Sequence, residues 1–175
     1  MGSPAPVHVA RAVAELHGHG WMHGDLQPAH VIRTVDGVRL IDFAWARHLG
    51  ETPWSAFRGT MAHLTAPEPA AEITVGSQPV LTSFASDVYA LAASLWTAVT
   101  GDWPLDYEAV GIDRKSAGPV ALLGAVGERT APLVGTEVWP EFQQVLKDVL
   151  LADARNRPSA AELADRLTAL GELGR

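Results

Sequence analysis

Two aspartates lie in surroundings that could bring their carboxylates together for chemistry. Asp25 belongs to the polar stretch His-Gly-Asp-Leu-Gln-Pro-Ala-His at 23–30, and Asp42 belongs to the run Leu-Ile-Asp-Phe at 40–43. In phosphoryl transfer, one carboxylate orients the attacking hydroxyl and a second holds Mg²⁺ against the phosphates. The two residues could instead be structural, with Asp25 capping a turn and Asp42 ending a strand.

The residues between the two aspartates predict a β-hairpin. Residues 31–35 and 38–41 are rich in β-branched and apolar side chains, and Asp36-Gly37 between them is a strong two-residue turn signal. A short hairpin returns the chain close to the point where it started. We therefore expect both carboxylates to face one cleft.

These stretches resemble the catalytic loop and the metal-binding motif of protein kinases, H-R-D-L-x-x-x-N followed by D-F-G. The resemblance implies that Asp25 is the catalytic base and that Asp42 binds the metal ion. It also implies that Ile32 forms part of the floor under the adenine of ATP. His23 and Phe43 would then be structural, with His23 filling an apolar position in the core.

Three further motifs resemble the same family and follow in the family's order. Residues 59–68 resemble the end of an activation segment (G-T-x-x-Y-x-A-P-E), and residues 86–91 resemble the start of the central helix of the large lobe. Residues 155–159 resemble the R-x-R-P-S run before the last helix. Each motif alone is weak, but their common order is specific to the large lobe of Ser/Thr kinases.

The resemblance also implies contacts that support the fold. Glu68 would form a buried ion pair with Arg157, which would tie the activation segment to the last helices. Asp87 would accept hydrogen bonds from the main chain of the catalytic loop. Thr60 would lie in the activation segment itself.

Four positions of the catalytic stretch depart from the family pattern. Gly24 replaces the arginine that would pair with an activation-segment phosphate, so control through such a phosphate is not expected. Gln27 replaces the lysine that reaches the transferred phosphate, and Ala44 replaces the glycine of D-F-G. His30 replaces the asparagine that ligates a second Mg²⁺, although Mg²⁺ prefers oxygen ligands to imidazole. The predicted catalytic residues are thus Asp25 and Gln27, and the predicted Mg²⁺ ligands are Asp42 and His30.

The small lobe of a protein kinase has no counterpart in this sequence. Residues 1–22 read as one helix over 6–18, ended by glycines. No Gly-rich phosphate loop is present, and neither Lys115 nor Lys147 occupies a position suited to the ATP-binding lysine. The expected fold is mainly α with short β-hairpins, a single helical domain like the large lobe of a kinase.

The whole chain, residues 1–175, is expected to form this one domain. The expected order is helix 6–18, catalytic loop and hairpin 21–43, activation segment 44–68, a loop at 69–83 and a helical remainder at 85–172. Within the remainder we expect helices at 85–100, near 105–110 and 118–126, and at 137–152 and 158–172.

Composition excludes several classes of protein. The chain has no cysteine, which excludes disulfides and thiol catalysis, disfavours a zinc site at His23 and His30, and suits a cytoplasmic protein. Its net charge is −7 without a basic run, which disfavours binding to nucleic acid or to an anionic membrane. No signal peptide and no stretch of 18 apolar residues occurs.

Three functions follow from these observations. We favour a pseudokinase-type interaction or regulatory module. The first alternative is an active Ser/Thr or peptide kinase, using ATP and Mg²⁺, whose small lobe comes from a partner chain. The second is a small-molecule phosphotransferase of the aminoglycoside-kinase type, whose catalytic loop also opens with His-Gly-Asp; the motifs at 59–68 and 155–159 argue against it.

A partner is expected in either of the first two cases. Without a small lobe, the face that this lobe would cover is exposed, and exposed apolar patches usually mark interaction sites. We expect a protein partner or a second copy of the chain to cover the surface formed by Ile32, Phe43, Trp45 and the adjacent hairpin. A small apolar cluster within the activation segment is the alternative explanation for Trp45 and Trp54.

Overall fold

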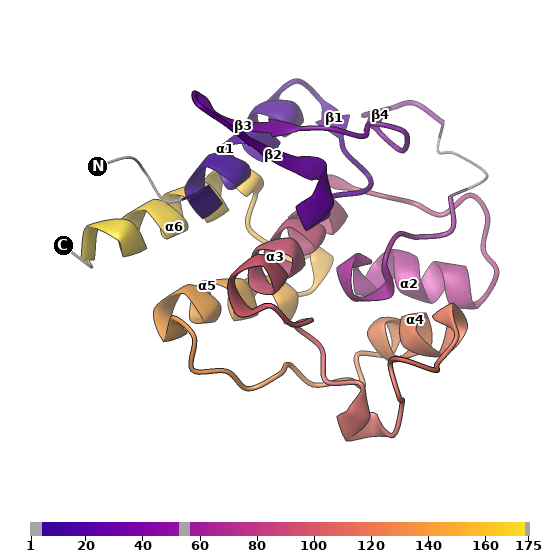
Figure 1. Ribbon diagram of the computed structural model, residues 1–175. Coiled ribbons are helices and arrows are strands. Elements are labelled where there is room, and N and C mark those ends of the chain that lie inside the picture. Colours follow the sequence, from indigo (N-terminus) through magenta and orange to yellow (C-terminus); the bar gives the residue numbers. More distant parts are fainter. Residues whose placement is uncertain (1–4, 53–56, 174–175) are drawn as a thin grey trace.

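The computed structural model describes residues 5–52 and 57–173, which form helices with short antiparallel strands at one end (Figure 1). The helices are α1 (Ala5–Gly18), α2 (Pro67–Thr74), α3 (Phe84–Thr100), α4 (Pro119–Gly127), α5 (Pro140–Leu150) and α6 (Ala160–Leu173). The strands are β1 (Trp21–Met22), β2 (Val31–Thr34), β3 (Gly37–Leu40) and β4 (Arg47–His48). The predicted class, mainly α with short β-hairpins, is confirmed.

Helix α3 is the central element, and its ends follow from its sequence. Ser83 caps the first turn: its hydroxyl accepts a hydrogen bond from the Ser86 N–H, and the Ser86 hydroxyl accepts one from the Ser83 N–H. All side chains from Ser86 to Trp96 are buried. Gly101 ends the helix at a φ of 78°, a left-handed conformation that glycine adopts without strain.

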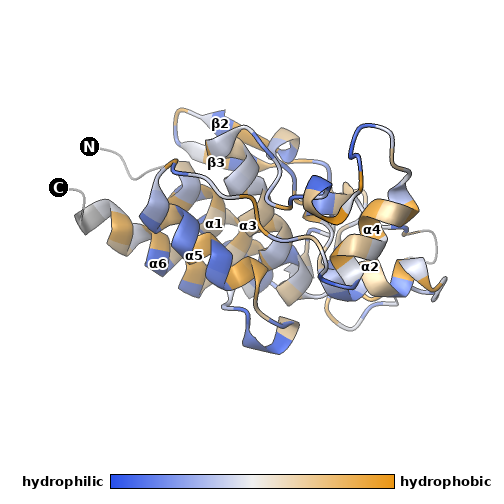
Figure 2. Cartoon of the chain, turned by 90° about the horizontal axis from the view of Figure 1, so that it is seen from below, coloured by the Kyte–Doolittle hydropathy of each residue, from blue (hydrophilic) through white to orange (hydrophobic). Residues whose placement is uncertain are grey.

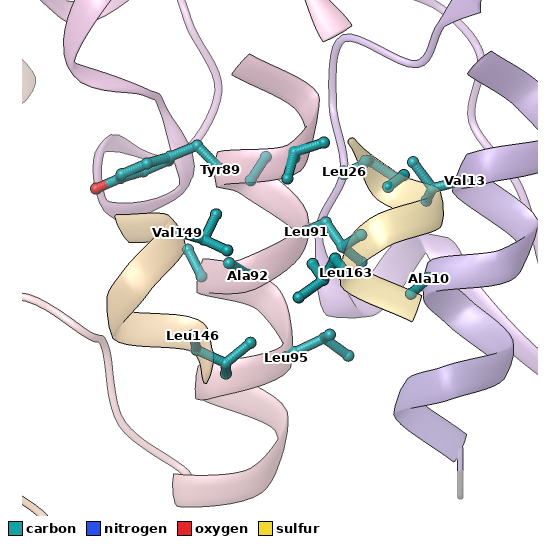
Figure 3. Packing of buried hydrophobic residues seen from close by; sticks show 14 of the residues in the cluster. Ala10, Val13, Leu26, Tyr89, Leu91, Ala92, Leu95, Leu146, Val149 and Leu163 are labelled. Carbon is teal, nitrogen blue, oxygen red and sulfur yellow. The ribbon is translucent and has the colours of Figure 1, made fainter. Parts of the chain in front are cut away.

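Helices α1, α5 and α6 pack around α3 and form the main core. Their apolar faces bring Val13, Leu146 and Leu163 into one cluster with Leu91 of α3, although these residues lie far apart in the sequence (Figure 3). Hydrophilic and hydrophobic residues alternate along α5 and α6 in Figure 2, as expected for helices with one face in the core. Burial of this cluster contributes favourably to the free energy of folding, because apolar area removed from water stabilises a fold by roughly 25 cal/mol per Å².

A second core lies between α2 and α4, which pack together on the opposite side of α3 (Figure 1). The expected loop at 69–83 was wrong for its first part, because α2 extends to Thr74. Pro67 stands at the first helical position, which favours helix initiation. Helix α4 is apolar along most of its length in Figure 2, and it buries Leu122, Leu123, Ala125 and Val126.

The strands form two small ribbons above the helices. Strands β2 and β3 pair as the predicted hairpin, with Ile32 opposite Arg39 and Thr34 opposite Gly37. Strands β1 and β4 pair over two residues each, and this second ribbon was not predicted. It draws the start of the 44–68 segment back to the catalytic loop.

The predicted boundaries lie within a few residues of the observed ones for the long helices. The helix expected at 105–110 is only a 3₁₀ turn, Glu108–Val110, and the helix expected at 137–152 begins at Pro140. No helix in the described part of the chain combines the length and the apolar character needed to span a membrane.

Candidate functional site

The side chain of Asp87 holds the main chain of the catalytic loop in place. Its side chain is buried on α3, and its two carboxylate oxygens accept hydrogen bonds from the main-chain N–H groups of His23 at 2.6 Å and Gly24 at 3.0 Å. The Nε2 atom of His17 lies 3.1 Å from the same carboxylate. The loop conformation is therefore set by a charged acceptor in the core. The sequence predicts His17 only as a structural residue at the end of a helix, from its place in the last turn of α1, and does not predict its contact with Asp87.

The ring of His23 is fully buried behind the loop. Its Nε2 lies 3.0 Å from the carbonyl oxygen of Ile41, so this nitrogen carries the proton, and its Nδ1 accepts from the Asp25 N–H at 3.3 Å. Burial lowers the pKa of His23, despite the neighbouring Asp87. The ring contacts that of Phe43, with 4.8 Å between centroids, and thereby connects the two predicted motifs.

Asp25 is mostly buried and is held by its neighbour. The amide nitrogen of Gln27 lies 3.2 Å from each carboxylate oxygen of Asp25. Desolvation raises the pKa of Asp25, against the opposing effects of His30 and Gln27. The carboxylate could accept a proton from a substrate hydroxyl, but its oxygens already accept from Gln27. Gln27 lies close enough to orient the base, without the positive charge that a lysine would supply.

His30 lies between the two aspartates. Its Nδ1 donates to the main-chain carbonyl of Asp25 at 2.8 Å and lies 3.6 Å from the Asp25 carboxylate. Its Nε2 lies 3.5 Å from the carboxylate of Asp42. The structure thus brings the predicted pair of carboxylates to one site, with an imidazole between them. Asp42 is half-exposed and has a φ of 60°, a left-handed conformation that aspartate tolerates better than most residues.

The donors present fit only part of a Mg²⁺ site. The Asp42 carboxylate is a suitable ligand, and the Nε2 of His30 is the other donor nearby. Within residues 5–52 and 57–173, no group of three His, Asp or Glu side chains is arranged to hold a metal ion. Mg²⁺ sites of phosphotransferases commonly use one or two carboxylates, with water and phosphate oxygens completing the coordination. Asp42 is therefore the candidate ligand, and any further ligands would have to come from nucleotide and water.

Three apolar side chains that lie near this site along the chain are exposed. The exposed fractions of Ile32, Ile41 and Phe43 are 46%, 38% and 48%. Ile32 stands on β2, whereas Ile41 and Phe43 flank Asp42 in the sequence; we refer to these three side chains together as the apolar face. Trp45 differs from the expectation for this surface, because it is half-buried and its ring packs on Phe57 at 5.4 Å. Trp54 lies outside the described residues.

Glu68 and Arg157 form a two-pronged ion pair, with N–O distances of 2.6 and 3.0 Å. The Arg157 side chain is completely buried and lies 5.1 Å from the Tyr89 ring. The Glu68 side chain, however, is 37% exposed and also lies 3.6 Å from Arg129. The expectation that both partners are buried is therefore wrong for Glu68, whose carboxylate is partly exposed to solvent.

Comparison with known proteins gives a consistent result. The family model described as "Protein kinase domain" matches residues 5–167. Serine/threonine-protein kinase AfsK of Streptomyces coelicolor is 30% identical over 162 residues, covering 91% of this chain and 18% of the relative. Serine/threonine-protein kinase mph1 of Schizosaccharomyces pombe is 30% identical over 171 residues, covering 87% of this chain and 25% of that protein. Serine/threonine-protein kinase PknK of Mycobacterium tuberculosis is 38% identical over 98 residues, covering 54% of this chain and 8% of that protein.

Proposed function

This chain belongs to the protein kinase domain family, and we propose that its 175 residues act as a regulatory binding module of that family. In this proposal, the apolar face of Ile32, Ile41 and Phe43 docks a second protein surface, either a partner or a second copy of the chain. The chain spans only about a fifth of the length of AfsK, so the activity of the complete relatives is not carried over to it.

The exposure of this face beside the carboxylate site is the observation that carries the proposal. Ile32 and Phe43 are each close to half-exposed, and exposed large apolar side chains favour burial against a partner. Arg39, opposite Ile32 in the hairpin, is also exposed. A partner surface that pairs an apolar patch with an acidic residue would suit this arrangement.

Phosphoryl transfer is the second candidate function, and the geometry around His30 favours it. Asp25 and Asp42 both approach this imidazole, at 3.6 and 3.5 Å, so the carboxylate pair is kept at one site. ATP and Mg²⁺ would supply the transferable phosphoryl group and neutralise its charge. Asp42 would hold the cation, Asp25 would orient the substrate hydroxyl, and Gln27 would position Asp25. The docked partner would have to provide the remaining contacts to the nucleotide.

We expect Phe43→Asp to abolish docking on this face, because the new carboxylate would lose its hydration on burial. The measurement is hydrogen exchange of residues 31–43 at low and high protein concentration, together with sedimentation of the same samples. Val120→Asp is the matched control, since Val120 is also exposed but lies on α4. A hairpin that stays unprotected in every state, or assembly that survives Phe43→Asp, would contradict the proposal.

A further inference from the structure

The main chain of the catalytic loop directly contacts the segment that follows Asp42. Gly24 has a φ of 79°, and a Cβ atom placed on it would lie 2.6 Å from the carbonyl oxygen of Trp45. Real Cβ atoms essentially never come within 3.0 Å of a neighbour. Position 24 can therefore accept the Trp45 main chain at this distance only because it is glycine. Glycine at this position therefore leaves space for the Trp45 main chain and carries no charge.

Arg47 also holds the segment that follows Asp42 in place, through contacts away from Gly24. This side chain is 9% exposed, and its guanidinium donates to the carbonyl oxygens of Glu51 at 2.8 Å and Thr82 at 2.9 Å. One nitrogen also lies 3.7 Å from the sulfur of Met22. The partners of the Arg47 guanidinium are thus two main-chain carbonyls and one thioether, and none of the three is a carboxylate or a phosphate. Arg47 thus joins β4 to the loop before α3 through groups of the chain itself.

Phe57 and Thr60, in the later part of the segment, line the space beside Gly24. Phe57 is buried and packs edge-on against the Trp45 ring. Between Gly24, Phe57 and Thr60 lies a cavity of about 20 Å³, which has room for roughly one water molecule. The buried carboxylate of Asp87 also lines this cavity. A phosphate group on Thr60 would meet a narrow space and the like charge of Asp87 there.

We infer that Gly24, Arg47 and Phe57 form an internal anchor that holds residues 43–52 and 57–60 against the catalytic loop without a phosphate group. The anchor positions the two aspartates relative to one another, because Gly24 precedes Asp25 and Trp45 closely follows Asp42. It also reverses the usual effect of phosphorylation, since a charge on Thr60 would loosen this segment. The inference does not depend on whether the chain transfers phosphoryl groups or docks a partner.

The test compares two glycines with nearly the same backbone conformation. Gly101 has a φ of 78°, and a Cβ atom there would meet nothing within 4 Å. Gly101→Ala therefore introduces backbone strain alone, whereas Gly24→Ala adds the clash with Trp45. The readout is hydrogen exchange at the amides of Ala46 and Leu49, which donate to the carbonyls of Phe43 and Gly20.

We expect Gly24→Ala to speed exchange at both amides at least about tenfold more than Gly101→Ala, because it opens the segment locally. If Gly24→Ala does not fold, Arg47→Met provides the same test, because it keeps the apolar stem and removes the donors. Thr60→Glu should also speed exchange, whereas Thr74→Glu on the exposed end of α2 should not. Equal exchange in the two glycine variants, unchanged exchange in Arg47→Met, or stronger protection in Thr60→Glu would overturn the inference.

Discussion

Replacing Glu68 with alanine is expected to lower the free energy of unfolding by roughly 3–5 kcal/mol, the cost of leaving one partner of a buried ion pair uncompensated. The Arg157 side chain has no exposure to solvent, and Glu68 is its carboxylate partner at 2.6 Å. Arg129 would lose an ion pair at the same time. Because Glu68 is partly exposed, we expect a value near the lower end of this range.

Chemical denaturation with two matched variants checks this result. Glu128→Ala removes an exposed carboxylate at the end of α4 and should change stability by less than about 0.5 kcal/mol. Asp42→Asn removes a charge at the candidate site while keeping a residue that tolerates its positive φ, and it should also have little effect. Similar losses in Glu68→Ala and Asp42→Asn would contradict the assignment of Glu68 to the fold and of Asp42 to chemistry.

Acidification to about pH 4 is expected to destabilise the fold by roughly 3 kcal/mol through His63 alone. The His63 ring is buried and stacks on Trp103, with 4.0 Å between centroids. Burial, with a smaller contribution from Arg114, lowers the pKa of His63 from 6.5 to about 4. The unfolded chain takes up this proton near pH 6.5, whereas the folded chain takes it up only near pH 4. Stability is therefore lost as the pH falls through this window.

His63→Phe should remove much of this acid sensitivity, because phenylalanine keeps the stacking on Trp103 and cannot be protonated. The measurement is the free energy of unfolding at several pH values between neutral pH and 4. His23, whose pKa is also lowered, should leave a residual slope of the same sign. Asp25, whose pKa is raised, acts in the opposite direction. An unchanged slope in His63→Phe would contradict the role given to this buried ring.

Local signals in the sequence predicted the long elements and the hairpin. The Asp36-Gly37 turn set the pairing of β2 with β3, and apolar spacing with a glycine stop predicted α1 and α3. Helix α2 was not recognised, because Pro69 and the nearby turn residues favoured a loop over its eight-residue span. The β1–β4 ribbon could not be predicted from pattern, since strands of two residues have no measurable periodicity.

The candidate site was predictable in its residues but not in its contacts. The spacing of Asp25 and Asp42 indicated that they meet, and both lie beside His30. The contact of Gly24 with Trp45 depends on the path of a segment that has no regular structure. The partial exposure of Glu68 likewise depends on where the surface falls. Both features depend on tertiary packing between distant segments, which local sequence patterns do not reveal.

Direct titration of the 175-residue chain with ATP and Mg²⁺ tests the central claim, that this lobe alone is a binding module. In the proposed nucleotide site, Ile32, Asp25 and Asp42 would line only one side, and the two lysines of the sequence lie elsewhere, at Lys115 and on α5 at Lys147. Isothermal titration calorimetry should therefore show a Kd weaker than about 0.1 mM, a binding free energy near −5.5 kcal/mol. A micromolar Kd that is lost in Asp42→Asn would contradict the claim, because the carboxylate site would then hold nucleotide without a second protein surface.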